Sequence, residues 1–407
     1  MEEYRTYTLE ELSIGKGSYG IAASAVPFEA SLHTYLRITD INDDGSLNKS
    51  GLMSVDEVDA EKYLLKPNDI VFARTGNSTG RSYFYDGSDG ELVYAGFLIK
   101  FSLDSAKVNP RILKYYTHSK PYYDWVQSFG TGSTRGNINA KTYGNMPIPL
   151  PPRDIQDKVV DVLKSLDDKI EVNRRINDNL EQQAQALFKS WFVDFEPFKE
   201  GEFEETEQGM IPKGWKAGSL EDITVQKSER VGDRDDVKVL SPVTTGQLML
   251  SEEYFTKQVF SESIAKYKVV EIGDFAYNPA RVNIGSLGRN NYDFDGCVSP
   301  VYVVLSCKDG YAHLFDLYRK TEKFKTEVNL RAIGGVRQSL NYKDFAFIQC
   351  IVPPYRVVEE FNAMYEHLLV MQKHTQEESE RLASLRDSLL PRLMSGELKV
   401  NEIENVI

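Results

Sequence analysis

The sequence predicts an α+β protein built by internal duplication: two similar α+β domains, separated by two long α-helices that pack on each other as an antiparallel coiled coil. The dipeptides Pro151-Pro152 and Pro353-Pro354 each precede a long stretch with helical periodicity, and they lie 202 residues apart. The same offset relates Arg135 to Arg337, Asn139 to Asn341, and Leu187 to Leu389. A period of this length exceeds that of solenoid repeats. It indicates two whole domains, each followed by its own helix, in a pseudo-twofold duplication.

The composition is that of a globular protein. Of 407 residues, 41% are hydrophobic and 11% aromatic, which is enough to bury sizeable cores. The net charge of -13 argues against a uniformly basic nucleic-acid-binding protein, but charge acts locally. Within residues 323–343, five basic side chains stand against the single acidic residue Glu327. An acidic protein with a locally basic surface is therefore compatible with the sequence.

Cellular location is predicted from three features. The cysteines Cys297, Cys307 and Cys350 form no C-x-x-C pair, and the first residues lack a basic-then-apolar signal segment. No apolar run approaches the length that a membrane span needs. We expect a cytoplasmic protein that does not associate with a membrane.

The first half of the chain predicts one α+β domain and one long helix. Residues 1–152 alternate short strand-like runs with turn clusters such as Asp43-Asp44-Gly45. Residues 153–195 then carry apolar side chains at three- and four-residue spacing, with no proline or glycine before Pro197. This pattern predicts a helix of roughly 38 residues, about 57 Å long at 1.5 Å per residue.

The second half repeats this order. An acidic linker at 196–214 leads to a second α+β domain at 215–354, a second long helix at 355–398 and a short tail at 399–407. The apolar stripe of a helix this long exceeds what one small domain can cover, so the two helices are expected to pair. Both stripes turn polar, at Asn173 and Asn177 in one and at Thr375 and Ser379 in the other. These positions either set the register of the pair or lie on its surface.

Several segments resemble one protein family. Residues 187–198, LFKSWFVDFEPF, and residues 389–398, LLPRLMSGEL, look like the ends of the two conserved helices in the specificity subunit of type I restriction-modification systems. The paired Pro-Pro openings and the segment Pro212-Lys213-Gly214-Trp215 fit the same family. The resemblance covers essentially the whole chain.

The resemblance implies a non-catalytic protein without a cofactor or metal. Two target recognition domains would each read one half of a bipartite site in double-stranded DNA, and the conserved helices would hold them apart. The helices would also dock two modification subunits, which carry the methyl-transfer chemistry, and through them the restriction subunits. Candidate partner contacts are Leu187, Trp191, Phe192, Phe195, Leu389 and Leu393, although aromatic residues at a helix end are also common core residues.

Polar residues in predicted loops are the candidates for DNA binding. Arginine can hold guanine and asparagine adenine through two hydrogen bonds, while hydroxyl groups and lysine suit phosphates. In the first domain the candidates are Arg74, Asn77, Ser78, Arg81, Thr131, Ser133, Thr134, Arg135, Asn137, Asn139 and Lys141. In the second they are Asn278, Arg281, Asn283, Arg289, Arg331, Arg337, Gln338, Ser339, Asn341 and Lys343. The repeated Arg135/Arg337 and Asn139/Asn341 pairs favour a shared function, although a shared structural role before each helix would give the same pairing.

Two other functions compete with this interpretation. The segment Gly15 to Gly20 matches G-x-G-x-x-G, which would suit a self-sufficient, nucleotide-dependent or DNA-modifying enzyme. The match is weak, because no clear strand precedes it, no good crossover helix follows it, and the other half lacks it. A coiled-coil adaptor that never touches DNA is the other alternative, and it would leave the arginine-bearing loops unexplained.

Overall fold

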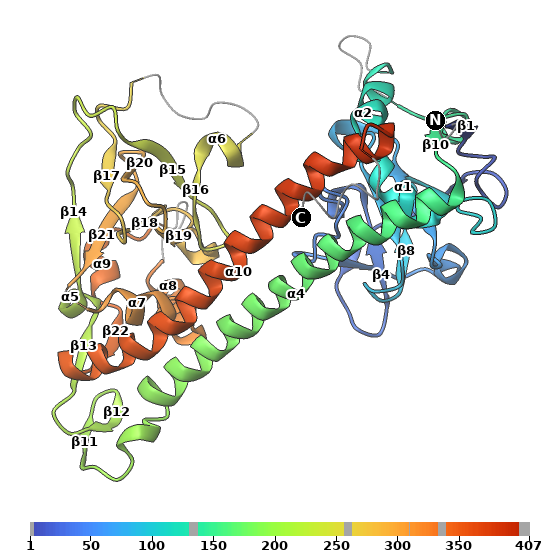
Figure 1. The fold of residues 1–407 in the computed structure, drawn as a ribbon. Coiled ribbons are helices and arrows are strands. Elements are labelled where there is room, and N and C mark those ends of the chain that lie inside the picture. Colours follow the sequence, from blue (N-terminus) through green and yellow to red (C-terminus); the bar gives the residue numbers. More distant parts are fainter. Residues whose placement is uncertain (1–3, 130–136, 256–262, 309, 333–338, 399–407) are drawn as a thin grey trace. The chain divides into compact units, whose positions relative to one another are not determined.

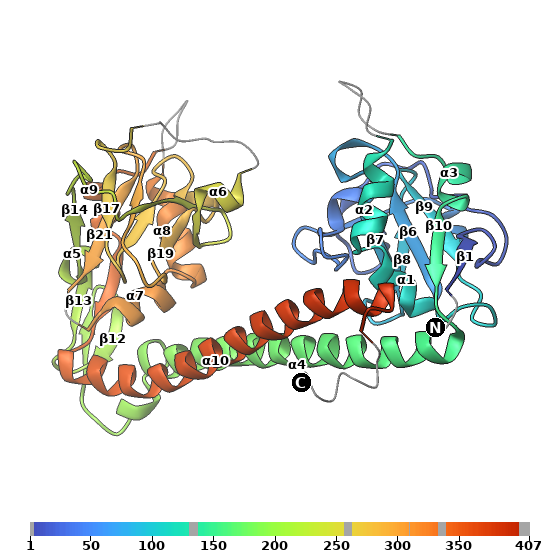
Figure 2. The same ribbon diagram turned by 45° about the horizontal axis from the view of Figure 1, so that its top comes forward.

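A computed structural model describes residues 4–129, 137–255, 263–308, 310–332 and 339–398 of the chain. The chain divides into two compact units, which are drawn in Figures 1 and 2. The first unit comprises Met1–Asn173 and Glu377–Ile407, and the second comprises Arg174–Gln376. Each long helix therefore contributes one part to each unit.

The first unit contains two four-stranded sheets and a two-stranded ribbon. One sheet has the order β2-β9-β6-β7 and the other β3-β5-β4-β8, while β1 pairs with β10. All these neighbours are antiparallel except β4 and β8, which are parallel. The strands are β1 (Arg5–Thr8), β2 (Ser18–Tyr19), β3 (Val26–Pro27), β4 (His33–Leu36), β5 (Met53–Val55), β6 (Asp69–Ala73), β7 (Ser82–Tyr85), β8 (Leu92–Tyr94), β9 (Leu98–Ser102) and β10 (Pro147–Leu150).

The second unit has the same kind of architecture. Its sheets have the orders β14-β21-β18-β19 and β16-β15-β20-β17, and β13 pairs with β22. The strands are β13 (Lys216–Ser219), β14 (Thr224–Lys227), β15 (Lys238–Pro242), β16 (Leu248–Leu250), β17 (Lys268–Val270), β18 (Phe275–Tyr277), β19 (Leu287–Arg289), β20 (Gly296–Val298), β21 (Val303–Cys307) and β22 (Gln349–Val352).

Short helices cover these sheets. In the first unit they are η1 (Ile38–Asp40), η2 (Ala60–Tyr63), η3 (Gly76–Ser78), α1 (Pro110–Tyr116), α2 (Lys120–Gln127) and α3 (Ala140–Gly144). In the second they are α5 (Leu220–Ile223), α6 (Ser251–Tyr254), η5 (Val282–Ile284), α7 (Ala312–Tyr318), α8 (Glu322–Arg331) and α9 (Tyr342–Ala346).

The predicted duplication is confirmed by the strand topology. The order β2-β9-β6-β7 corresponds to β14-β21-β18-β19, and β5-β4-β8 corresponds to β16-β15-β20 with the parallel pair at the same place. Arg5 faces Leu150 in the first unit as Lys216 faces Val352 in the second. Only the edges of the second sheet differ, since β3 extends it in one unit and β17 in the other. The α+β class is thus also confirmed.

The helix α4 (Arg153–Phe192) has 40 residues and begins directly after Pro151-Pro152. The carbonyl of Pro152 accepts hydrogen bonds from the backbone N–H groups of Ile155 and Gln156, which starts the helical pattern. After the helix, Phe195 adopts the left-handed conformation with φ of 55°. Its ring lies edge-on against Trp215, with ring centroids 5.5 Å apart, so packing holds the turn that ends the helix.

The helix α10 (Tyr355–Ser395) has 41 residues and passes through Pro391 in its last turns. Gly396 follows it with φ of +73°, the left-handed conformation that commonly ends a helix. Within the described residues, no helix of the chain is long and apolar enough to cross a membrane.

The two long helices pair antiparallel in each unit. In the first unit, Arg386 donates to Asp167 over 2.9 Å and Asn173 donates to Glu378 over 2.8 Å, so higher numbers on α4 meet lower numbers on α10. In the second unit, Thr375 donates to Asn177, and the rings of Trp191 and Phe361 lie 5.9 Å apart. The predicted antiparallel pairing is confirmed. The polar positions Asn173, Asn177 and Thr375 face the partner helix, while their role in setting register stays a prediction.

The helices complete the cores of both units. In the first, Val159 and Leu163 of α4 and Leu389 and Leu393 of α10 are at most 1% exposed and belong to the same core as Phe72. In the second, the core around Phe275 includes Phe192 of α4 and Phe361 of α10. Further cores lie around Val71 and Val304 in the respective units.

The segment at 196–214, expected as an acidic linker, is folded. It contains η4 (Glu196–Phe198) and a hairpin of β11 (Phe203–Thr206) with β12 (Gly209–Pro212). Ile211 on this hairpin is fully buried in the second core. The assignment of 1–152 and 215–354 as recognition domains, and of 153–195 and 355–398 as the conserved helices, remains a prediction.

Candidate nucleic-acid interface

The loop between β6 and β7 carries four of the predicted DNA-binding residues. Arg81 forms an ion pair with Asp43 at 2.6 Å and donates to the carbonyl of Ile41 at 3.1 Å, so it braces the loop from inside. Ser78 is buried, and Asn77 is exposed. Gly80 has φ of +92°, and an added Cβ would come within 2.6 Å of the Val126 side chain. The loop is thus tightly packed and exposes Asn77 at its tip.

Arg74 begins this loop and contacts two distant segments. Its backbone N–H donates to the carbonyl of Phe97, and its carbonyl accepts from Ile138, at 3.1 and 3.0 Å. Its guanidinium lies over the ring of Tyr19, 5.0 Å from the centroid. The Tyr19 hydroxyl in turn accepts a hydrogen bond from the backbone N–H of Ala140 at 3.1 Å. Three loops therefore meet at one place.

The third of these loops carries Asn137, Asn139 and Lys141. Asn137 is exposed and forms a backbone bridge with Thr75. The Asn139 side chain accepts from the backbone N–H of Thr142 at 2.9 Å, which caps α3. Lys141 is exposed on the rim of a groove that Lys16, Tyr19 and Asn139 also line, together with the acidic Glu10 and Glu11. The residues Thr131, Ser133, Thr134, Arg135, Arg337 and Gln338 lie outside the described residues.

The second unit repeats this backbone frame. The backbone N–H of Leu340 donates to the carbonyl of Pro279 at 3.0 Å, as Ile138 donates to Arg74. The Asn341 side chain caps α9 through the N–H of Asp344, as Asn139 caps α3. Capping explains why these asparagines recur, so the structural alternative accounts for this pair. Their contact with DNA stays a prediction.

The other candidates of the second unit differ in availability. Arg281 is exposed, Asn278 and Asn283 are half-buried, and Ser339 and Lys343 are exposed. Arg331 is engaged internally, because it pairs with Glu327 and donates to the carbonyl of Phe347. Arg289 donates to the carbonyl of Gly273 and contacts His313.

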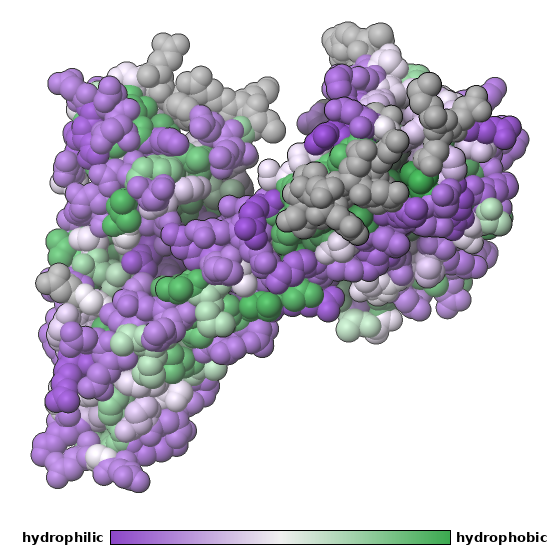
Figure 3. All heavy atoms as spheres, viewed as in Figure 1, coloured by the Kyte–Doolittle hydropathy of each residue, from purple (hydrophilic) through white to green (hydrophobic). Residues whose placement is uncertain are grey.

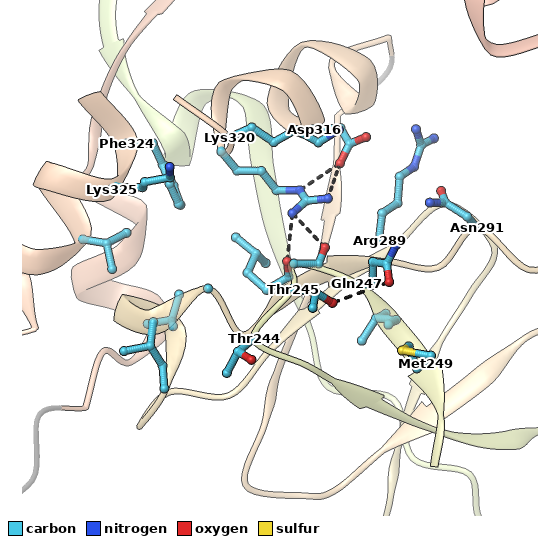
Figure 4. A pocket seen from close by; sticks show the side chains of 18 of the residues that line it. Thr244, Thr245, Gln247, Met249, Arg289, Asn291, Asp316, Lys320, Phe324 and Lys325 are labelled. Atoms are coloured by element: carbon cyan, nitrogen blue, oxygen red, sulfur yellow. Dashed lines mark hydrogen bonds and ion pairs between the residues drawn. The ribbon is translucent and has the colours of Figure 1, made fainter. Parts of the chain in front are cut away.

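A cavity of about 950 Å³ opens beside the loop of Arg281 (Figure 4). One wall is the turn between β15 and β16, with Thr244, Thr245 and Gln247. Arg319 supports this turn by donating to the carbonyl of Gly246 at 3.0 Å and to that of Leu287 at 2.9 Å. The turn also packs on the loop of η5, since an added Cβ at Gly285 would come within 2.5 Å of the Thr244 carbonyl oxygen.

The base of this cavity holds a nearly buried ion pair. Asp316 and Arg319 lie 2.6 Å apart, with side chains 12% and 9% exposed. Burial opposes ionisation of Asp316, but the positive charges of Arg319, Lys320 and Arg289 outweigh it, and the pKa of Asp316 is lowered. Arg319 therefore keeps a charged partner while it orients the turn.

The predicted partner contacts lie mostly inside the units. Phe192 and Phe195 are 7% and 9% exposed and belong to the second core, against which Leu187 and Trp191 are packed. Leu389 and Leu393 are 1% exposed in the first core. Exposed apolar side chains are found instead at Val172, Met364, Val370 and Met371 on the long helices and at Val193 directly after α4. Figure 3 shows apolar surface along the two long helices within a mostly hydrophilic surface.

The glycine-rich motif Gly15 to Gly20 has a structural role and not that of a dinucleotide-binding loop. The segment after Gly15 continues into the strand β2, whereas a dinucleotide site needs a helix at this place. An added Cβ at Gly17 would come within 2.5 Å of the Phe101 ring, and one at Gly20 within 2.2 Å of the Tyr94 carbonyl oxygen. Close packing therefore requires these glycines.

Sequence reasoning missed Tyr19 and the turn Thr244, Thr245 and Gln247. A turn of small polar residues between two apolar runs is the signal that points to Thr244–Gln247, since Val243 and Leu248 flank it. The ring contact of Tyr19 with Arg74 joins residues far apart in sequence, and no local pattern reveals it.

Comparison with known proteins agrees with this architecture. Residues 33–182 match the family model of the type I restriction modification DNA specificity domain. The chain is 27% identical over 303 residues to the type I restriction enzyme MjaIX specificity subunit of Methanocaldococcus jannaschii, covering 72% of this chain and 69% of the relative. It is 23% identical over 409 residues to the HindI specificity subunit of Haemophilus influenzae, covering 83% and 88%.

A solved structure has a similar fold. The crystal structure of a type I restriction-modification S subunit from M. genitalium matches with a TM-score of 0.52 at 13% identity, covering 96% of each chain. The chain is thus similar in sequence and in fold to specificity subunits of type I restriction-modification systems.

Proposed function

We propose that this chain is the DNA-reading specificity subunit of a restriction-modification complex, in which each half binds one half of a bipartite site. The observation that carries the proposal is the duplicated frame with unlike side chains. The same backbone hydrogen bond ties Arg74 to Ile138 in one unit and Pro279 to Leu340 in the other. A shared scaffold suits a shared target, double-stranded DNA, and different side chains on it suit different base sequences.

The candidate base-reading residues follow from exposure and from the contact with Tyr19. In the first half they are the exposed Asn77 and Asn137 and the half-buried Arg74, which lies over the Tyr19 ring, and in the second Arg281 and the turn Thr244–Gln247 beside it. Glutamine and asparagine can bind adenine, and arginine guanine, through two hydrogen bonds each. The internally paired Arg81 and Arg331 fit a bracing role better, and Lys141 and Lys343 suit phosphates.

The long helices are proposed to set the gap between the half-sites and to dock two modification subunits, with restriction subunits bound through them. Exposed Val172, Met364, Val370 and Met371 support a docking face on these helices, because isolated apolar side chains along a helix surface offer area to a partner. The chain itself is proposed to be non-catalytic and to act in the cytoplasm. Purified chain should incorporate no methyl label into DNA from S-adenosylmethionine, and incorporation that persists through repurification contradicts this.

The decisive experiment exchanges one recognition domain. Methylated sites are mapped in cells that carry the modification subunits with either the natural chain or a chain whose residues 1–152 come from a homologue. The exchanged domain should keep the apolar residues that face Val159 and Leu389, because these complete its core. One half of the methylated motif should change and the other should stay. A motif that changes in both halves would show that the units do not read DNA independently.

A further inference from the structure

The glycine-rich loop before Tyr19 is unexplained by the proposed function, and its geometry suggests what it does. Gly17 lies against the Phe101 ring and Gly20 against the Tyr94 carbonyl, so the segment around β2 packs closely against β9 and β8. Between them Tyr19 remains 42% exposed, and Lys16 is exposed at the same groove. The glycines therefore serve to bring one aromatic ring to a defined position on the surface.

That ring is fixed by its hydroxyl group. The backbone N–H of Ala140 donates to the Tyr19 hydroxyl at 3.1 Å, directly beside the α3 cap formed by Asn139. The ring face then lies 5.0 Å from the guanidinium carbon of Arg74. An arginine that stacks on an aromatic ring is held by the ring's negative face while its hydrogen-bond donors stay at the edge of the guanidinium plane.

Arg74 is suited to an external partner. Its backbone is fixed on both sides by hydrogen bonds to Phe97 and Ile138. Within the part of the chain that the structure describes, its guanidinium forms no hydrogen bond or ion pair, although its Nε atom is buried, whereas Arg81 is engaged by Asp43 and Ile41. A fixed backbone and a stacked guanidinium whose two terminal Nη groups make no internal hydrogen bond match what bidentate recognition of a guanine edge requires.

We propose that Tyr19 is a positioning residue that holds Arg74 ready to read a guanine in the half-site of the first unit. This inference rests on the proposed function and names one contact within it. Pro279 occupies the equivalent backbone position in the second unit and carries no such donor. The guanine contact therefore belongs to one half of the recognised motif.

The test uses the full chain in complex with its modification subunits and duplexes that carry the natural motif or one altered base pair at a time. Arg74→Ala should lower affinity for the natural duplex by roughly 5- to 150-fold and remove discrimination at one guanine. Tyr19→Leu should lower it by about 2- to 5-fold and weaken discrimination at the same guanine. Tyr19→Phe keeps the ring and loses only the hydrogen bond from Ala140, so it should lower affinity less than Tyr19→Leu does and affect the same guanine.

One further variant and a stability measurement test the interpretation. Arg74→Lys keeps the charge but lacks the paired N–H donors of the guanidinium, so it should lose discrimination as Arg74→Ala does. Thermal unfolding of each variant shows whether the first unit is folded, and if Tyr19→Leu unfolds, the comparison of Tyr19→Phe, Arg74→Lys and Arg74→Ala decides alone. Equal weakening on all duplexes would mark Arg74 as a phosphate contact and overturn the proposal. Different positions affected by Tyr19 and Arg74 would overturn it too. A natural complex without a two-part motif would instead refute the proposed function.

Discussion

The stacked rings Phe72–Tyr143 and Tyr277–Phe345 occupy corresponding places in the two units, with centroids 4.7 and 4.9 Å apart. In the first pair the tyrosine is the helix residue Tyr143, and in the second it is the strand residue Tyr277. The Tyr143 hydroxyl donates to the Ala73 carbonyl at 2.9 Å, whereas the Tyr277 hydroxyl is buried without a partner among the described residues. The duplicated cores thus keep ring packing and differ in hydrogen bonding.

This difference predicts opposite effects of the same substitution. Tyr143→Phe should destabilise the first unit by about 1 kcal/mol, because a buried hydrogen bond is lost. Tyr277→Phe should leave the second unit unchanged or stabilise it by about 1 kcal/mol, because a buried polar group without a partner is removed. Chemical denaturation of both variants measures the effect. Equal losses in the two units would contradict the assignment.

His118 makes the first unit sensitive to acid. Burial of the imidazole, aided by the positive charges of Lys114 and Arg386, outweighs the opposing effect of Asp44 and lowers the pKa of His118 to about 4. The unfolded chain binds this proton near pH 6.5 and the folded chain only near 4. The unfolding free energy is therefore fully retained above pH 6.5 and falls as the pH drops toward 4.

Unfolding measured between pH 7 and 4.5 should show this loss in the natural chain and a shallower one in His118→Gln. His367 is exposed on α10, and His367→Gln serves as the control that keeps the natural slope. Identical slopes for the natural chain and His118→Gln would refute the role of His118.

At the scale of elements, Asp167 of α4 links the helices of the first unit. Asp167 accepts hydrogen bonds from Lys114 and Tyr115 of α1 and from Arg386 of α10, at 2.7, 3.0 and 2.9 Å. Burial opposes its ionisation, but Lys114 and Arg386 outweigh burial and lower the pKa of Asp167. One carboxylate thus joins three helices.

Asp167→Asn should lower the unfolding free energy by about 2–4 kcal/mol, because Arg386 keeps its charge in a partly buried place with a weaker partner. The next residue supplies the control. Asp168 is 58% exposed and, among the described residues, pairs only with Lys164 one turn away, so Asp168→Asn should cost less than about 1 kcal/mol. If the two variants are equally stable, the three-helix junction is not a significant source of stability.

The long helices were predictable because their apolar spacing is local and the Pro-Pro pairs mark where they begin. The expected ranges 153–195 and 355–398 correspond to Arg153–Phe192 and Tyr355–Ser395. Sheet order could not be predicted, since pairs such as β1 with β10 join residues about 140 positions apart, and short strands carry little periodicity. The internal engagement of Arg81 likewise depends on Asp43, which nothing near Arg81 in sequence reveals.

At the scale of the whole molecule, α4 and α10 cross from one unit to the other at residues 173–174 and 376–377. If they set the gap between half-sites, four residues inserted at both places should lengthen it. Four residues add about 6 Å, or about two base-pair steps of 3.4 Å. Methylation mapping should then find both half-sequences with one or two extra unspecified base pairs.

Insertion into α4 alone should lower DNA methylation by the complex, because the contacts of Asn173 with Glu378 and of Asn177 with Thr375 can no longer form together. Two residues inserted in both helices should also fail, since they turn the apolar stripe by about 200°. If the four-residue variant is active and the gap between its half-sites is unchanged, the helices only connect the two units and do not set the gap.

The composition of the first unit has a consequence for biosynthesis. Its core needs Leu389 and Leu393, which are translated after the whole of the second unit, while the second unit is continuous from 174 to 376. The nascent chain therefore completes the second unit first and leaves Val159 and Leu163 uncovered until Leu389 and Leu393 have been added. A chain that stops at residue 376 should show cooperative unfolding of the second unit, together with fast hydrogen exchange in residues 153–173 and a tendency to aggregate. Slow exchange in residues 153–173 would mean that the first unit folds without the C-terminal part of α10. The order of translation would then not expose its core.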